Sequence, residues 1–174
     1  MENPHIKAGL RIKHRIALTA FACALPAIPF IGHLSLATWV IGLLISFVWA
    51  NLFEYVYHRW PLHDHNSRLY KRHVGHHTTV GTPEEPENTT FAGNSWSILA
   101  LFGLNIIPFL FFKMWPVVLI GFMLYFLALE EAHWRIHTDG WVPFGKEHHF
   151  RHHDIPTKQF NVYIPLFDWI FGTL

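Results

Sequence analysis

The chain has 174 residues, of which 51% are hydrophobic, 17% aromatic and only 14% charged. Soluble domains usually carry about 25% charged residues, so this composition indicates a membrane protein with a single domain. The formal net charge of +1 offers no basic surface for nucleic acid, and the single cysteine, Cys23, excludes both an intramolecular disulfide and a cysteine-based metal site. Any metal site must therefore be built from histidine and carboxylate side chains.

The first apolar run follows a cationic start that contains Lys7, Arg11, Lys13 and Arg15. We expect a membrane span over residues 16–34 and a second over residues 36–57, joined by a tight uncharged turn. A cationic start before an apolar run is also typical of a cleaved signal peptide. That alternative leaves the direction of the second span unchanged.

The polar stretch from residue 58 to residue 94 carries a first set of spaced histidines, a pair followed by a trio: His58 and His63, then His73, His76 and His77. Pro61 is expected to break the helix between the pair, because residues five apart on an unbroken helix do not share a face. Residues 67–77 predict a short amphipathic helix, and i, i+3, i+4 spacing turns the three imidazoles to one face. The Pro-, Thr- and Glu-rich residues 78–90 predict an irregular loop, interpreted as a connector, with a lid or a headgroup contact as the alternative.

Two further spans are predicted at residues 97–112 and 117–132, with a short turn between them. Four spans return the chain to the side of its N-terminus. Twelve of the 13 Lys and Arg residues then fall on that side, and only Lys113 falls on the other. The positive-inside rule therefore predicts that both termini and both sets of histidines are cytosolic, with the histidines at the membrane surface.

A second set of histidines follows the fourth span and repeats the pair and the trio: His133 and His137, then His149, His152 and His153. Ten histidines exceed the roughly four protein ligands of one zinc ion and suit two metals side by side. Imidazole nitrogen is a good ligand for iron, zinc and copper, whereas magnesium and calcium prefer oxygen. The spacing alone leaves iron and zinc open.

Metal-bound imidazoles are usually oriented by a group that accepts the proton of the other ring nitrogen. Glu54 lies four residues before His58, and Glu130 lies three residues before His133, so helical spacing makes both carboxylates candidates. Asp168 is a further candidate because it lies in the closing segment of the chain. For Glu54, a carboxylate that extends to water from a helix end is the alternative.

The motifs HRWPLH, HVGHH, HWRIH and HFRHH, with the ending NVYIPLFDWIFGTL, resemble the fatty acid hydroxylase and sterol desaturase superfamily of membrane di-metal enzymes. The similarity runs from about His58 to Leu174 and is closest to fatty acid 2-hydroxylases. It implies an all-α membrane fold, with four transmembrane helices capped by a cytosolic histidine-rich domain. It also implies metal ligands at His58, His63, His73, His76, His77, His133, His137, His149, His152 and His153. His65 and His148 are extra to the pattern.

The resemblance implies two iron ions, O2 as co-substrate, and a separate electron donor of the cytochrome-b or ferredoxin type. The leading hypothesis is O2-dependent hydroxylation of a membrane lipid acyl chain. The histidines begin where the second and fourth spans end, so we expect metals at headgroup level and reaction near the carboxyl end of the chain, at the second carbon. A desaturase or a sterol or carotenoid oxidase is the alternative within the superfamily. A membrane metal-binding or transport protein is the alternative outside enzymes, although transport favours ligands at mid-membrane.

Overall fold

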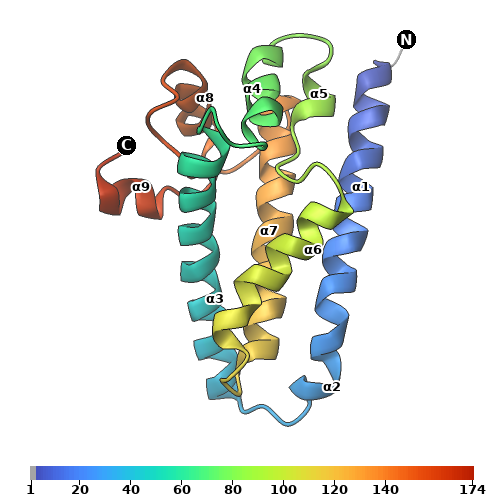
Figure 1. Cartoon of the computed structure of the whole chain (residues 1–174), viewed down its shortest axis with the longest axis vertical. Coiled ribbons are helices and arrows are strands. Elements are labelled where there is room, and N and C mark those ends of the chain that lie inside the picture. Colours follow the sequence, from blue (N-terminus) through green and yellow to red (C-terminus); the bar gives the residue numbers. More distant parts are fainter. Residues whose placement is uncertain (1–2) are drawn as a thin grey trace. The chain divides into compact units, whose positions relative to one another are not determined.

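The structure is a computed structural model that describes residues 3–174, and within that range it is built from helices without strands (Figure 1). The predicted all-α class is therefore confirmed. The α-helices are α1 (Pro4–Ala24), α2 (Ile28–Ile31), α3 (Leu36–Tyr57), α4 (Tyr70–Thr79), α5 (Glu85–Asn88), α6 (Ser95–Ile106), α7 (Trp115–His137), α8 (Lys146–Asp154) and α9 (Leu166–Phe171). The short turns η1 (Leu25–Ala27) and η3 (Ile107–Phe109) are 3₁₀ helices, and η2 (His58–Leu62) is a π-helical turn.

The chain forms two compact units. The histidine unit comprises the residues up to Ile12 together with Asn51–Phe91 and Leu129–Leu174. The apolar unit comprises Lys13–Ala50 and Ala92–Ala128. Each unit combines segments that are far apart in the sequence, and neither corresponds to one of the two sequence halves that repeat the pair and the trio.

Three helical segments within residues 3–174 are long and apolar enough to cross a membrane: Pro4–Ile31, Leu36–Leu62 and Trp115–His137. They correspond to the first, second and fourth predicted spans. The first helix begins at Pro4, so the cationic residues that precede the predicted span at residue 16 lie on its first turns. Together these helices indicate a membrane protein, and the count of four spans stays a prediction.

The third predicted span coincides with a shorter apolar helical segment, Ser95–Phe109. Its first turn is capped by Asn94, whose side chain accepts a hydrogen bond from the Ser97 backbone N–H at 2.9 Å. Pro108 lies inside the 3₁₀ turn that follows α6 and ends the regular helix. The 12 residues of α6 rise about 18 Å at 1.5 Å per residue, less than the roughly 30 Å hydrocarbon core.

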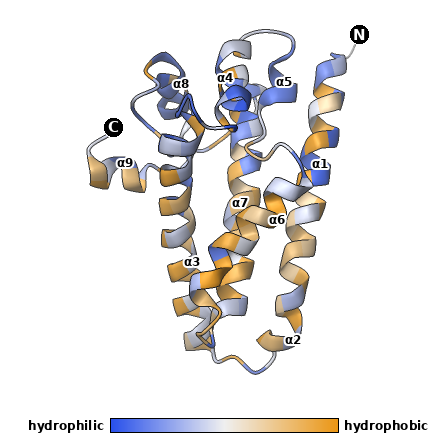
Figure 2. Ribbon diagram, in the orientation of Figure 1, coloured by the Kyte–Doolittle hydropathy of each residue, from blue (hydrophilic) through white to orange (hydrophobic). Residues whose placement is uncertain are grey.

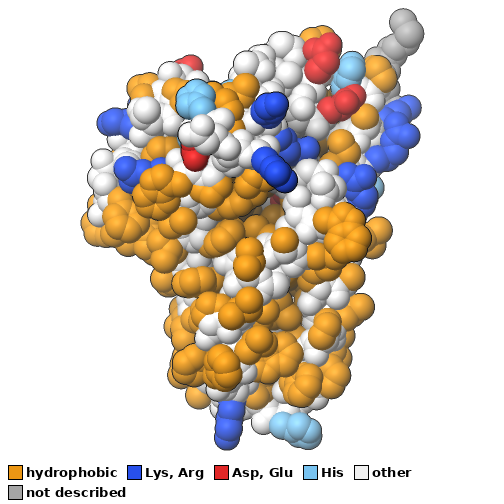
Figure 3. Space-filling view, viewed as in Figure 1, with side chains coloured by type: hydrophobic (Ala, Val, Ile, Leu, Met, Phe, Trp, Pro, Cys, Tyr) orange, Lys and Arg blue, Asp and Glu red, His pale blue; other side chains and the backbone are white. Residues whose placement is uncertain are grey.

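The helices of the apolar unit are rich in hydrophobic residues (Figure 2), and large hydrophobic side chains are exposed on the surface (Figure 3). Leu36 is 80% exposed and Phe111 is 93% exposed, whereas polar Ser46 and Asn105 are buried. The buried polar groups are paired, since Ser46 donates to the Val118 carbonyl at 3.1 Å and the Trp49 indole donates to the Asn105 side chain at 2.9 Å. An apolar exterior around paired polar groups is the arrangement that lipid surroundings require.

Small residues let α3 and α7 approach closely in the apolar unit. A Cβ atom added at Gly121 would lie 2.6 Å from the Ser46 hydroxyl, and one added at Gly42 would lie 2.8 Å from a Val117 methyl group. Contact of this kind replaces the hydrophobic effect as the force that joins helices in a membrane. The pairing of these two helices therefore depends on the missing side chains.

Replacing Gly121 with leucine should lower the melting temperature of the detergent-purified protein, because overpacking typically costs about 1–3 kcal/mol. Gly103→Leu is the matched control, since a Cβ atom at Gly103 meets nothing within 4 Å. Circular dichroism during heating measures both variants. Equal melting temperatures for the two would contradict the close approach of α3 and α7.

Candidate metal centre

The histidine unit gathers its imidazoles into two adjacent groups. The first group contains His58, His63, His73, His77 and His152. The second contains His76, His133, His137 and His149. Within each group, one ring nitrogen from every member lies within 4.8 Å of the others, and both groups can hold a metal ion. The tenth predicted ligand, His153, places its Nε2 atom 3.0 Å from Nε2 of His149, beside the second group.

The two trios are divided between the groups. On α4, His73 and His77 are one helical turn apart and join the first group, whereas His76 joins the second. On α8 the division is reversed, because His152 joins the first group and His149 joins the second. Each short helix therefore contributes imidazoles to both groups: α4 contributes His76 to the second group, and α8 contributes His152 to the first. The two adjacent metal positions expected from the sequence are thus linked through both helices.

The helix is not broken at Pro61, and this prediction was wrong. Pro61 lies inside the π-helical turn His58–Leu62, which continues directly from α3. Hydrogen bonds in a π-helix join residues five apart, so the wider turn brings such residues to the same face. The rings of His58 and His63 accordingly lie with their centroids 5.3 Å apart.

Hydrogen bonds to the outer ring nitrogens determine where two imidazoles of the first group carry their protons. Nδ1 of His58 donates to the Phe160 carbonyl, and Nδ1 of His152 donates to the Lys158 carbonyl at 2.6 Å. A carbonyl can only accept, so the proton is on Nδ1 and Nε2 presents a lone pair. This is the protonation state of a metal-binding imidazole.

The inner nitrogens of the first group face one another. Nε2 of His73 lies 3.0 Å from Nε2 of His58 and 3.0 Å from Nε2 of His63. Nε2 of His63 also lies 3.1 Å from Nε2 of His152, whose proton is on the opposite nitrogen. Where two of these nitrogens both carry lone pairs they repel, unless a proton or a cation lies between them. The donor set therefore fits a transition metal with nitrogen ligands.

Burial keeps these imidazoles neutral at physiological pH. Loss of solvation lowers the pKa of His63 to about 4, and loss of solvation with nearby imidazoles lowers the pKa of His77 to about 4. Burial also lowers the pKa of His152 to about 3, although its hydrogen bond to the Lys158 carbonyl partly opposes the shift. At pH 7 the lone pairs are therefore available for a metal without prior loss of a proton.

Two of the predicted carboxylates bind the backbone that orients His58. Asp168 accepts from the Phe160 N–H at 2.8 Å, and the Phe160 carbonyl in turn accepts from His58. Glu54 accepts from the Val162 N–H at 2.6 Å, two residues further along. Both carboxylates thus hold the segment that carries the accepting carbonyl. That Glu54 and Asp168 orient His58 stays a prediction, and they would do so through the backbone of this segment and not by direct contact with the ring.

The third predicted carboxylate, Glu130, accepts from the Phe91 N–H at 3.1 Å. The Phe91 ring lies 4.8 Å from that of His133 and 5.8 Å from that of His58, so it contacts both groups. His148, which is extra to the sequence pattern, lies 3.2 Å from Asp168 through its Nε2 atom.

Glu85 is a further partner of the imidazoles and is not among the carboxylates predicted from the sequence. Its Oε1 atom lies 2.6 Å from Nδ1 of His137, and both side chains are buried. The residues are 52 positions apart, so helical spacing could not have paired them. The sequence feature that could have pointed to Glu85 is the acidic, Pro-rich stretch of residues 78–90, which lies between the two sets of histidines and is interpreted above as a connector. It contains the short helix α5, which lies beside α4 (Figure 1).

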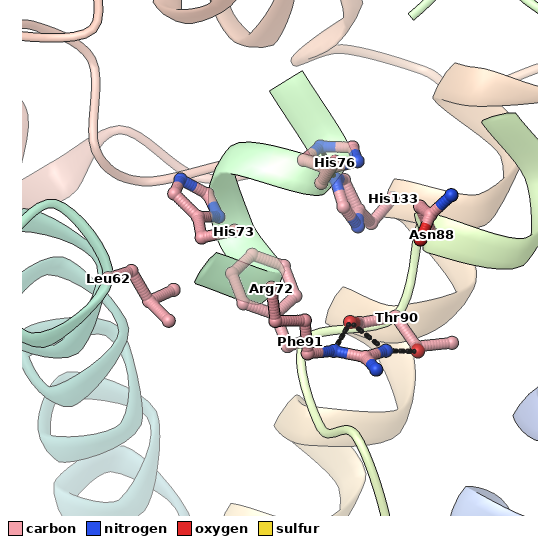
Figure 4. A pocket seen from close by; sticks show the side chains of 8 residues that line it. All are labelled: Leu62, Arg72, His73, His76, Asn88, Thr90, Phe91 and His133. Atoms are coloured by element: carbon pink, nitrogen blue, oxygen red, sulfur yellow. Dashed lines mark hydrogen bonds between the residues drawn. The ribbon is translucent and has the colours of Figure 1, made fainter. Parts of the chain in front are cut away.

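A small cavity opens onto both groups (Figure 4). Its walls include His73 from the first group and His76 and His133 from the second, with Phe91 beside them. Arg72 also lines it, and donates to the Thr90 carbonyl at 2.9 Å. The volume of about 10 Å³ is close to the minimum that holds one water molecule. A molecule of that size can therefore reach both groups at once.

The family model described as "Fatty acid hydroxylase" matches residues 43–173. The chain belongs to the fatty acid hydroxylase family. The resemblance seen in the histidine motifs is thus confirmed at the level of the family, which implies a lipid oxidoreductase and is known for iron use. No curated protein and no solved structure matches the chain. The particular similarity to fatty acid 2-hydroxylases is not confirmed by the match.

Because each trio is divided between the two groups, we expect variants on different helices to remove the same metal ion. His152→Ala and His73→Ala lie on different helices but in the same group, so each should remove about one metal ion per chain. The double variant should lose no more metal than either single variant. His65→Ala is the control and should retain the wild-type content. Elemental analysis of the purified proteins measures this, and complete metal loss in the double variant alone would contradict the grouping.

Proposed function

We propose that this protein is an O2-dependent di-iron hydroxylase of a membrane lipid acyl chain. The observation that carries the proposal is the pair of adjacent, buried, neutral imidazole groups in a member of the fatty acid hydroxylase family. Two irons bound there would supply the chemistry that reduces O2 and removes hydrogen from an unactivated C–H bond. Zinc is redox-inert and would not support this reaction, although its preference for imidazole allows it to occupy the same ligands. The side chains around the metals would exclude water from the site and position the substrate.

The aromatic side chains around the imidazoles would limit access of water. Phe160 is buried and packs against His58, His63 and His152, with ring centroids 6.0, 5.9 and 5.7 Å away. Phe91 occupies the corresponding place beside His133 and the cavity. A dry site strengthens the fixed electrostatic interactions and protects reactive species from side reactions.

The site of oxidation is proposed from the position of the ligands on the spanning helices. His58 follows directly on α3, and His133 and His137 lie on the last turns of α7. Ligands at the ends of spans favour metals at headgroup level, where a lipid held by its polar head presents the carbons near its carboxyl end. We therefore favour the second carbon over mid-chain positions. Desaturation, or oxidation of a sterol or carotenoid, is the alternative within the superfamily.

The partners and the orientation follow from the same proposal. Reduction of O2 requires electrons, and we propose a separate donor of the cytochrome-b or ferredoxin type with its reductase. A soluble donor must reach the site from the cytosol. The excess of Lys and Arg on one side of the predicted topology supports a cytosolic metal centre and cytosolic termini.

Incubation with ¹⁸O2, a lipid extract and a reducing system should yield an acyl chain with one labelled oxygen at its second carbon. His76→Ala should abolish the product, because this imidazole belongs to the second group and also lines the cavity. Mass spectrometry with fragmentation locates the label. A new mid-chain double bond without label would instead assign the protein to the desaturases.

A reporter fused after Leu174 should be active only when it requires the cytosol, because four spans return the chain to its cationic side. A fusion after Lys113, the single cation of the opposite side, is the matched control and should give the inverse result. A C-terminal reporter active only in the periplasm or lumen would overturn the topology.

A further inference from the structure

The carboxylate of Glu85 is held on both of its oxygens. One oxygen accepts from Nδ1 of His137 at 2.6 Å, and the other accepts from the Gly81 backbone N–H at 2.7 Å. Gly81 has φ +76°, a conformation that favours glycine and that turns its N–H toward the carboxylate. The His137 side chain is 0% exposed and that of Glu85 is 11% exposed. The contact is therefore a buried, charge-assisted hydrogen bond with a fixed direction.

The second group has few other means of orienting its rings. The Nδ1 atoms of His76, His149 and His153 are buried, and none of these three has a hydrogen-bond partner in the described part of the chain. In the first group, by contrast, His58 and His152 donate to backbone carbonyls. Glu85 thus supplies the orienting partner of His137 in the second group, and adds a negative charge. A carboxylate on the outer nitrogen fixes the tautomer and raises the basicity of the inner nitrogen.

The first turns of α1 support the loop that carries Glu85. Nδ1 of His5 lies 2.6 Å from Oε1 of Glu87, and a Cβ atom at Gly9 would lie 2.3 Å from the Pro86 carbonyl oxygen. The same Cβ atom would lie 2.6 Å from the ring of Trp134, which stands on α7 between His133 and His137. The absence of a side chain at Gly9 therefore allows α1 to rest on both the loop and the ligand-bearing helix. His5 and Gly9 precede residue 43, where the family match begins.

We propose that Glu85 is a positioning residue that holds His137 for metal binding, and that the first turns of α1 keep Glu85 in place. The inference rests on the proposed function only in that the histidine groups bind metal. It assigns a role to a loop interpreted from sequence as a connector, and to a helical segment outside the family match.

Cobalt(II) is a suitable probe because imidazole binds it and its visible spectrum reports ligand geometry. The wild-type protein should bind two cobalt ions per chain. Glu85→Gln preserves the size of the side chain but removes its charge, and should weaken one of the two ions by about 10- to 100-fold while altering the visible bands. Glu84→Gln is the matched control, since its side chain is exposed and adjacent in sequence. It should bind both ions as the wild type does.

Equal cobalt affinity and equal spectra for Glu85→Gln and the wild type would overturn the role of Glu85 without affecting the metal centre. A wild-type protein that binds no cobalt would overturn the metal centre itself, and this proposal with it. Thermal unfolding of the metal-free proteins separates positioning from folding. The unfolding temperature of Glu85→Gln should remain close to that of the wild type while its cobalt spectrum changes.

The contribution of α1 is tested with His5→Ala, which removes the contact to Glu87 without steric conflict. It should weaken the same cobalt ion by roughly threefold, the loss expected for a partly exposed pair. His14→Ala, an exposed histidine on the same helix, is the control and should leave both ions unchanged. If His5→Ala matches His14→Ala, α1 does not support Glu85. Gly9→Leu places a side chain against the Pro86 carbonyl and the Trp134 ring, so it should weaken the same cobalt ion more than His5→Ala does.

Discussion

The histidine unit depends on one constraint, that buried imidazoles must turn their lone pairs toward one another. Outward hydrogen bonds place the proton of His58 and His152 on Nδ1, and this leaves both Nε2 atoms without protons among other ring nitrogens. Burial in turn keeps the rings neutral, since desolvation lowers the pKa of His63 and His77 to about 4. Converging lone pairs are unfavourable without a cation, so metal binding would contribute directly to the stability of this unit.

The division of the trios explains why the sequence contains a pair and a trio twice. A helix of two to three turns cannot surround a metal, but it can supply two imidazoles one turn apart to one position and a third to a neighbour. On α4 the third is His76, and on α8 it is His152. The correspondence between the repeats places His153 with the second group, as His77 lies in the first, and agrees with its 3.0 Å contact to His149. Because each helix serves both groups, a shift of either one would disturb both.

The features that the sequence predicted correctly are local. Helical spacing identified α4, because histidine periodicity is expressed within a few turns. The second set repeats that spacing at the end of α7 and on α8. The helix at Pro61 and the contact between Glu85 and His137 were not predicted, because neither is determined by local sequence alone. Pro61 is accommodated in a π-turn, although its missing N–H suggested a break, and the pairing of Glu85 with His137 depends on the tertiary fold. Pro108 ends the regular helix of α6, and the third span over residues 97–112 stays a prediction.

The outer partners of the imidazoles make the two groups chemically different. The first group is oriented by neutral carbonyls of the segment that Glu54 and Asp168 hold from behind, so their charges act at a distance. The second receives the charge of Glu85 directly through the ring of His137. A more basic nitrogen donates more electron density, so the two positions would differ in affinity and in the charge they stabilise. The repeated histidine pattern therefore does not produce two equivalent sites, since the residues outside the repeat determine how each one behaves.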